Sequence, residues 1–420
     1  MIRMVTGRRL VGIDLVRSVA IIGAMGSHAF TVSGAFDGQN GIPMTAVRLL
    51  MGLATPVFIC LFGSMLEIAY RKKLDRDGPV ATVRQLLSRA AQCYLLYALA
   101  IIVRVAVGDF SMGYGLRCLL LMGVTPFSDI LKFYAVILVF APVILRLTRD
   151  RWGLAVLVTF SLAVQLAHPL LADLPRPPPV MGRNYLEFPA GFLYGGGDGP
   201  GGPSVLHGLG FVTFGLLIGH AARWLTRNPD EPGPGRVAFA ALTLMPLVAV
   251  LALWPRDASF SAVVSLLINM DFRNDNHPLY FAIGALTAAG AVWLATEHYD
   301  RGRARTARLS FIGTVSLFTF AFGNILLVLA RRLVVPESLS LAFGIVLLAA
   351  VVALSGLFWR SLTVGRARAG AGCSGALVAW AKAQNWVVSS IGAAVTPIGK
   401  AYARLLWPDA GLRRSGGEVG

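Results

Sequence analysis

Residues 11–33 read VGIDLVRSVAIIGAMGSHAFTVS, an apolar stretch long enough to cross a membrane that nevertheless carries ionisable residues. Asp14 and Arg17 are three residues apart, within salt-bridge reach on a helix. At 100° per residue, Arg17 and His28 share one helix face, about 16 Å apart along the axis. A charge inside a membrane costs about 3 kcal/mol or more unless it is paired or used. The stretch therefore predicts a helix that presents Asp14, Arg17 and His28 to the interior of a helix bundle. The alternative is that Asp14 and Arg17 form only a helix-packing pair and that His28 extends toward the outer surface.

The composition of the whole chain indicates a lipid environment. Of 420 residues, 56% are hydrophobic and only 14% are charged, whereas about a quarter of the residues of a soluble domain are charged. The net charge of +17 would suit nucleic-acid binding. However, Lys and Arg concentrate in every second connection between apolar stretches, as the positive-inside rule requires. We therefore expect the lipid bilayer as the partner and no nucleic acid.

The apolar stretches predict an all-α fold, a polytopic membrane bundle of about ten transmembrane helices. We expect these at residues 11–33, 47–70, 86–107, 127–147, 153–172, 204–225, 236–254, 277–296, 308–330 and 339–360. The run Leu116–Val124 is too short to cross and is expected to be a re-entrant or surface piece.

The distribution of Lys and Arg predicts the topology. With the N terminus inside, the inside segments carry 27 of these residues and the outside segments carry 10, while Arg17 lies within the first helix. This bias predicts that both termini are cytoplasmic and that the chain is a multi-pass protein of the plasma membrane. The first apolar stretch has a basic start but no small-residue cleavage site, so we expect a retained helix.

Two outside connections are long. Residues 173–203 contain PRPPP and GGGDGPGG and are expected to lack regular structure. This connection is either a binding surface or lid or merely a floppy link. Residues 255–276 include an apolar run, Phe260–Met270, that we expect along the membrane interface. We assign residues 1–360 to a transmembrane domain and 361–420 to a cytoplasmic basic tail, in which 374–407 favours an amphipathic surface helix over an eleventh crossing.

Several further residues are weaker candidates for substrate binding. Asp129 and Lys132, one turn apart, would line an acceptor site or form a surface pair. Arg104 would bind an anionic acceptor or extend to lipid headgroups. Arg273 and His277 cluster with Asp275 before the eighth helix, where a solvated loop is the alternative.

No metal site or disulfide is predicted. The four cysteines, Cys60, Cys93, Cys118 and Cys373, have no metal-like spacing, and three of them lie in apolar helices, where cysteine usually behaves as a small hydrophobic residue. We also find no Gly-rich phosphate loop and no serine nucleophile motif in the sequence.

The run RRLVGIDLVRSVAIIGAMGSHAF, residues 8–30, resembles the first helix of the membrane acyltransferase 3 superfamily, in which an Asp, an Arg three residues later and a His after ten more residues recur. The second stretch, ATPVFICLFGSMLEIAY, resembles the Phe-rich helix that follows. Three further stretches resemble the glucan succinyltransferase and heparan-glucosaminide acetyltransferase branches: RQLLSRAAQCYLLYAL, FSDILKFYAVILVFAP and LSFIGTVSLFTFAFGN. The chain departs from the family pattern at Ser18, usually Gly, and at Asn324, a His in some relatives.

This resemblance implies acyl transfer across the membrane. Acyl-CoA would enter from the cytoplasm as co-substrate, with no bound cofactor. A hydroxyl or amine of a polysaccharide, glycolipid or other polar acceptor would be acylated at the outer face. His28 would be the general base or a transient acyl carrier, Arg17 would hold the acyl-CoA, and Asp14 would orient Arg17. The alternatives are a secondary transporter of a small polar or anionic solute and a structural or sensing membrane protein.

Overall fold

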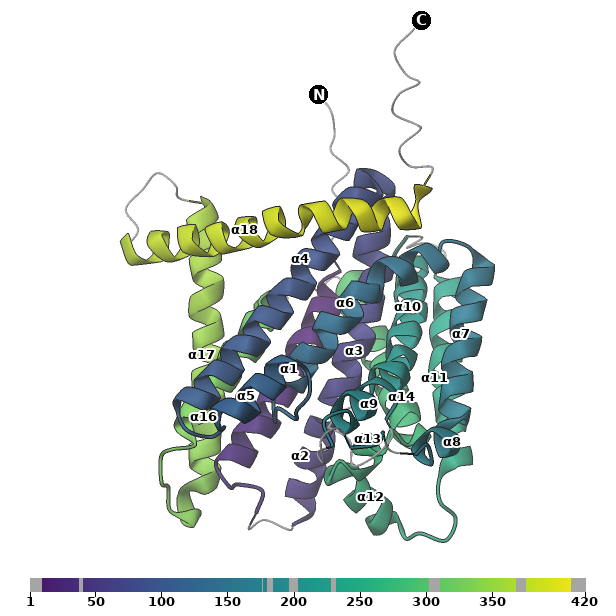
Figure 1. Ribbon diagram of the computed structural model, residues 1–420. Helices are drawn as coiled ribbons and strands as arrows, with labels where there is room; N and C mark the ends of the chain where they lie inside the picture. The colour runs from purple at the N-terminus through teal and green to yellow at the C-terminus, as the bar shows by residue number, and fades with distance from the viewer. Residues whose placement is uncertain are drawn as a thin grey trace, which may run out of the picture.

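The computed structural model describes residues 10–37, 41–175, 177–179, 184–195, 203–227, 232–301, 310–367 and 375–408. Within these ranges the chain is helical and contains no strand, which confirms the all-α prediction. Long helices stand side by side as a bundle, and several short helices gather at one end of it (Figure 1).

The longer helices are α1 (Val11–Val32), α2 (Ile42–Gly52), α3 (Ala54–Met65), α4 (Arg71–Ala106), α6 (Asp129–Leu147), α7 (Arg151–Leu166), α10 (Val205–Arg227), α11 (Gly233–Leu253), α14 (Pro278–Ala295), α16 (Ser316–Ala330), α17 (Ser340–Ala367) and α18 (Gly375–Leu406). The short ones are α5 (Met112–Leu119), α8 (His168–Ala172), α9 (Glu187–Tyr194), α12 (Phe260–Ile268), α13 (Asp271–Asn274) and α15 (Ser310–Thr314), with π-helical turns η1 (Leu66–Tyr70) and η2 (Thr296–Arg301) and the 3-10 turn η3 (Glu337–Leu339).

Among the residues that the structure describes, seven helical segments are long and apolar enough to cross a membrane, so the chain is a multi-pass membrane protein. One of them, Ile42–Ala106, spans 65 residues and includes α2, α3 and α4. The α4 segment is kinked at Gly78, whose φ of 80° suits glycine. Two shorter apolar helices, α7 and α16, lie among the long ones. The count of ten crossings stays a prediction, because length and composition alone identify these segments.

The connection at 173–203 is more ordered than its composition suggests. The prediction that it lacks regular structure is wrong for α9, an eight-residue helix. Glu187 favours the start of this helix, since its charge complements the helix dipole, and Gly195 ends it with a φ of 91°. Most of the GGGDGPGG run lies outside the described residues. In the second long connection, the predicted apolar run forms α12, which Ser259 caps by accepting a hydrogen bond from the amide of Ala262.

Helix α1 occupies the centre of the fold and packs against α3, α14, α15, α16 and α17. Its first turn has no cap from its own sequence. Instead Asp300, from η2, accepts hydrogen bonds from the amides of Val11 (2.7 Å) and Gly12 (3.1 Å). A carboxylate at a helix N terminus satisfies free amides and complements the helix dipole. A residue 289 positions away therefore fixes where α1 begins.

Helices α3 and α10 approach each other closely because small residues line their contact. A Cβ atom at Gly63 would lie 2.1 Å from the carbonyl oxygen of Val212, and one at Gly215 would lie 2.0 Å from that of Cys60. The Ser64 hydroxyl donates across the contact to the carbonyl of Gly215 at 2.9 Å. Small residues that let backbones meet are typical of packing between membrane helices.

A cluster of ionised groups joins η1 to α10. Glu67 is buried and forms ion pairs with Arg71, at 2.5 Å, and with Arg223. Arg71 also donates to the carbonyl of Thr148 at 2.9 Å. Local sequence does not connect Glu67 with α10, since Glu67 and Arg223 lie more than 150 residues apart. A buried carboxylate that has two guanidinium partners is compensated, so the cluster fixes the packing of these elements.

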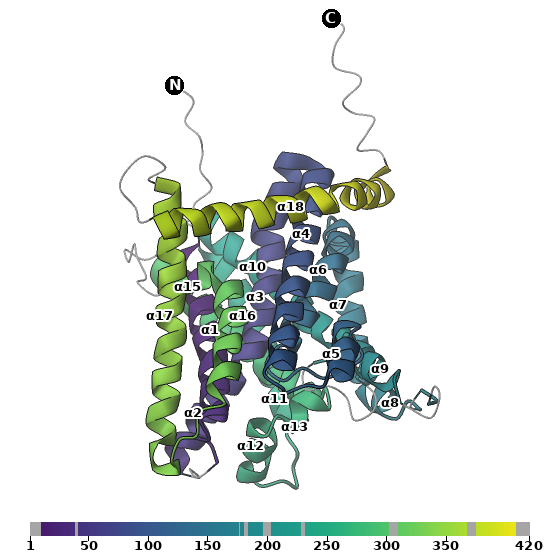
Figure 2. The same ribbon diagram turned by 60° about the vertical axis from the view of Figure 1, so that its left-hand side comes forward.

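Helix α18 lies across one end of the bundle, roughly perpendicular to the long helices (Figures 1 and 2). Tyr402 donates to the carbonyl of Val139 in α6 (3.1 Å), and Arg146 donates to that of Leu406 (3.2 Å). Ile398 and Leu405 remain exposed. This arrangement fits the amphipathic surface helix that the sequence predicts, and α18 is not among the segments long and apolar enough to cross. Its cytoplasmic location stays a prediction.

Topology is tested with single cysteines at positions 40 and 303, both of which lie outside the described residues. We expect Asn40→Cys to react with an impermeant thiol reagent applied to intact cells, and Arg303→Cys to react only after permeabilisation, as the charge bias requires. The background variant carries Cys373→Ser, and this variant alone serves as the unlabelled control. The opposite labelling pattern would reverse the assigned orientation.

Candidate active site

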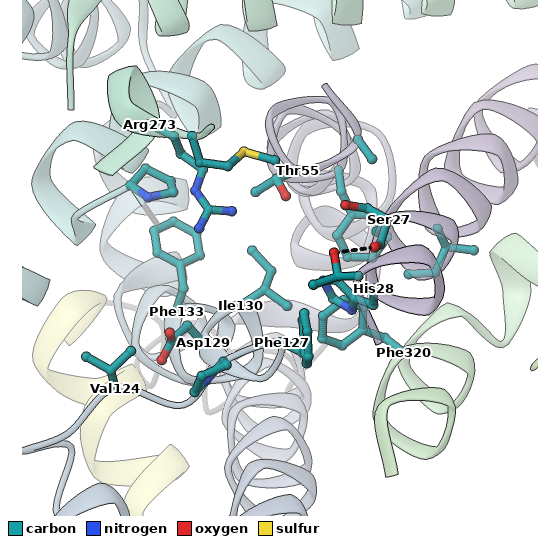
Figure 3. A pocket seen from close by; sticks show the side chains of 18 of the residues that line it. Ser27, His28, Thr55, Val124, Phe127, Asp129, Ile130, Phe133, Arg273 and Phe320 are labelled. Carbon is teal, nitrogen blue, oxygen red and sulfur yellow. Dashed lines mark hydrogen bonds between the residues drawn. The ribbon is translucent and has the colours of Figure 1, made fainter. Parts of the chain in front are cut away.

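A cavity of about 330 Å³ lies among α1, α3, α6, α9, α13 and α16 (Figure 3). Of these helices, α9 and α13 lie at the end of the bundle opposite α18 (Figure 1). Most of its lining is apolar. The polar side chains that line it are Ser27, His28, Thr31, Thr55, Asp129 and Arg273. An apolar cavity with a few convergent polar groups is the usual form of a small-molecule site.

His28 lines this cavity and is held from behind by α16. Its Nδ1 lies 2.8 Å from Oδ1 of Asn324. The Nδ2 of Asn324 in turn donates to the carbonyl of Phe127 at 2.9 Å. Both ends of the Asn324 amide are therefore used, and Asn324 is itself buried.

This arrangement determines the tautomer of His28. A carbonyl oxygen only accepts hydrogen bonds, so the NH₂ of Asn324 must face Phe127 and its oxygen must face the imidazole. Nδ1 of His28 therefore carries the proton and donates it to Asn324. In the neutral ring Nε2 is then the unprotonated nitrogen. A histidine with one nitrogen fixed as a donor and the other left basic is arranged as a general base.

Two aromatic rings fix the plane of the imidazole. Phe127 lies 4.5 Å from His28 between ring centroids, and Phe320 meets it edge-on at 5.7 Å. Phe127 adopts a φ of 68°, which is uncommon for a residue with a side chain. The same residue thus supplies a ring to His28 and a carbonyl to Asn324. Such strain persists only where surrounding contacts hold it in place, often at functional sites.

Arg104 and Lys132 supply those contacts. Arg104 is buried and donates to the carbonyl of Pro126 at 3.0 Å, next to Phe127. Lys132, 1% exposed, donates to the carbonyl of Gly123 at 3.3 Å. Neither residue lines the cavity. The structure therefore places these two predicted substrate-binding residues behind the loop at 123–128, where they support Phe127.

Asp129 lines the cavity, but its carboxylate already has partners. Lys132 lies 3.0 Å from Oδ1, and Thr125 donates to the same oxygen through its hydroxyl at 2.7 Å. Asp129 and Lys132 thus form an ion pair that lies mostly inside the protein, so the alternative of a surface pair is wrong.

Asp14 and Arg17 form the expected ion pair, at 3.5 Å, one helical turn apart. Ser18, the departure from the family pattern, donates to the carbonyl of Asp14 (2.8 Å) and accepts from the amide of Gly313 (2.7 Å). It therefore joins α1 to α15. The cavity lining contains His28 but neither Asp14 nor Arg17, so a passage from Arg17 to His28 stays a prediction.

Arg273 lies in α13 and His277 follows that helix, and the two have different surroundings. Arg273 lines the cavity, and His277 does not. The pKa of His277 is lowered mainly by burial and to a smaller extent by the charge of the neighbouring His168. The neutral ring accepts a hydrogen bond from the amide of Leu279 at 3.2 Å and so caps α14. Its observed role is to begin a helix.

A partly buried histidine, fixed by an amide and facing a cavity within a membrane bundle, is the arrangement that acid–base chemistry requires. A family described as an acyltransferase domain matches residues 10–360. The chain belongs to this family, the membrane acyltransferase 3 superfamily, and is an acyltransferase. No curated protein matches the chain in sequence.

Proposed function

We propose that this membrane acyltransferase takes its acyl group from cytosolic acyl-CoA. The acceptor is the hydroxyl or amine of a sugar-like molecule at the predicted outer face of the plasma membrane. The observation that carries this proposal is the hydrogen bond of His28 to Asn324, which leaves Nε2 basic at the cavity. An uncharged hydroxyl needs such a base to become a nucleophile at neutral pH.

The chemistry follows from that nitrogen. Nε2 of His28 removes the proton of the acceptor hydroxyl or amine as its oxygen or nitrogen attacks the thioester carbonyl. The C–S bond then breaks, and the imidazolium returns the proton to the departing thiolate of CoA. The products are the acylated acceptor and CoA, and His28 regains its starting state. Through its hydrogen bond, the oxygen of Asn324 stabilises the imidazolium that forms in between, because the charged ring is the stronger donor.

Arg17 lies about three turns, and Asp14 about four turns, from His28 on the same helix. In the proposed reaction Arg17 binds the CoA portion or the acyl carbonyl on the cytoplasmic side, and Asp14 orients its guanidinium through their ion pair. Arg17 near one end of α1 and His28 near the other suit a donor and an acceptor that arrive from opposite sides of the membrane. Membership of the acyltransferase family favours this enzyme over the transporter alternative.

The proposal is tested with purified protein in lipid nanodiscs, supplied with acyl-CoAs of different chain types and a panel of neutral and charged sugars. CoA release is followed with a thiol reagent, and the products are identified by mass spectrometry. Release that depends on both a donor and a sugar acceptor supports the proposal. Product formed from a donor other than acyl-CoA, or uptake of a solute without CoA release, would contradict it.

A further inference from the structure

Arg273 brings a positive charge to the cavity that no described residue neutralises. Its guanidinium extends into the open space, on the side across from His28 and near Thr55 (Figure 3). Its Nε is buried and has no hydrogen-bond partner within the described part of the chain. A buried donor of a charged group that lacks a partner is costly, so its retention calls for a ligand that supplies one.

The acidic residue of the lining forms no ion pair with Arg273 within the described part of the chain. Asp129 is the only carboxylate among the described lining residues, and Lys132 and Thr125 already occupy its Oδ1. The remaining polar lining consists of hydroxyls and the imidazole of His28. The cavity wall therefore has an excess of positive charge at Arg273, in surroundings that are otherwise apolar and screen charge poorly.

The backbone that carries Arg273 is held firmly. Met270 and Asn276, on either side of α13, both have positive φ angles, 67° and 56°. Asn276 accepts a hydrogen bond from the amide of Ser204 at 2.7 Å, and the amide of His277 donates to the carbonyl of Phe272 at 2.8 Å. Phe272 is buried in the core. An arginine near a membrane surface commonly extends to water, but these contacts keep Arg273 turned to the cavity.

We propose that the cavity binds the anionic group of a substrate, a carboxylate or phosphate, through the guanidinium of Arg273, while His28 acts on the group that is acylated. This inference rests on the proposed acyltransferase reaction. Guanidinium groups recognise carboxylates and phosphates through paired hydrogen bonds. The anion is either the far carboxylate of a dicarboxylic acyl chain or a charged group on the acceptor, since both components must meet at His28.

The experiment compares matched pairs of substrates in wild type and Arg273→Gln. The donor pair is acetyl-CoA and malonyl-CoA, and the acceptor pair is glucose and glucuronate. One of these two pairs differs by the anionic group that Arg273 binds: the donor pair if the anion is on the acyl chain, the acceptor pair if it is on the sugar. For that pair, we expect Arg273→Gln to raise KM for the charged member by about 10–100-fold, the range typical of hydrogen bonds to charged groups. The neutral member should change less than about twofold. Arg273→Lys keeps the charge but not the paired hydrogen-bond geometry, so its KM for the charged member should lie between those of wild type and Arg273→Gln.

Arg256→Gln is the matched control, because Arg256 is exposed and outside the cavity lining. A binding readout makes the test independent of turnover: malonate, glucuronate or inorganic phosphate should raise the melting temperature of wild type and Arg256→Gln, but not that of Arg273→Gln. Turnover without any charge preference, and no thermal shift from these anions, would overturn the inference and leave the acyltransferase reaction standing. Thermal shifts without CoA release from any pair would instead count against the proposed reaction.

Discussion

Replacement of His28 with alanine is expected to abolish acyl transfer while the protein still folds and inserts. A positioned general base contributes about 10²–10⁴-fold to rate, and no other described side chain in the cavity lining can replace it: Asp129 is committed to Lys132, and Arg273 is a cation. CoA release by purified protein with saturating donor and acceptor measures the loss. A larger loss would accompany a transient acyl group on His28, because a covalent route would then disappear as well.

The main risk to this test is indirect damage. His28→Ala leaves the oxygen of Asn324 without its partner, which costs about 1–3 kcal/mol. Size-exclusion profiles and melting temperatures in detergent show whether the variant is intact. His298→Ala is the control, because this histidine is exposed and outside the cavity lining. We expect it to retain full activity. Near-normal turnover by an intact His28→Ala variant would remove His28 from the mechanism.

Much of the fold was predictable because membrane helices can be recognised from their local composition, a long stretch of apolar residues. Each predicted span has a helix in the structure, and α5 confirms that the stretch around Leu116 is too short to cross. The prediction failed at α9, where PRPPP and GGGDGPGG suggested that the whole connection was irregular. There a local signal, Glu187 before an apolar run and Gly195 after it, was present but was outweighed by the flanking composition.

The site was predictable only in part, because much of its geometry comes from contacts distant in sequence. The spacing of Asp14, Arg17 and His28 could be read from one helix. Asn324 lies 296 residues from His28, and the resemblance marks it only as a departure from the family pattern, not as the residue that fixes the imidazole. Arg104 and Lys132 looked like substrate ligands, since charged residues near helix ends often face water. Their burial depends on how the loop before α6 folds back, which local sequence does not determine.

Asn324 provides the second large effect that we expect. Replacement with leucine removes the acceptor that holds the Nδ1 proton and frees the ring to tilt or change tautomer. A misplacement of about 1 Å can cost on the order of 100-fold, so we expect kcat to fall about 10–100-fold while KM for acyl-CoA changes little. Steady-state kinetics in nanodiscs separate the two parameters.

The ranking of two Asn324 variants separates positioning from packing. Asn324→Asp keeps an oxygen for Nδ1 of His28 but buries a charge and loses the donor to Phe127. Leucine avoids the buried charge, which is costly when unpaired. If Asn324 merely fills space, leucine is the milder change and aspartate the more damaging. If it orients the base, aspartate retains more kcat than leucine. Thr319→Val, a buried change on the same helix α16, controls for packing and should leave kcat near the wild-type value.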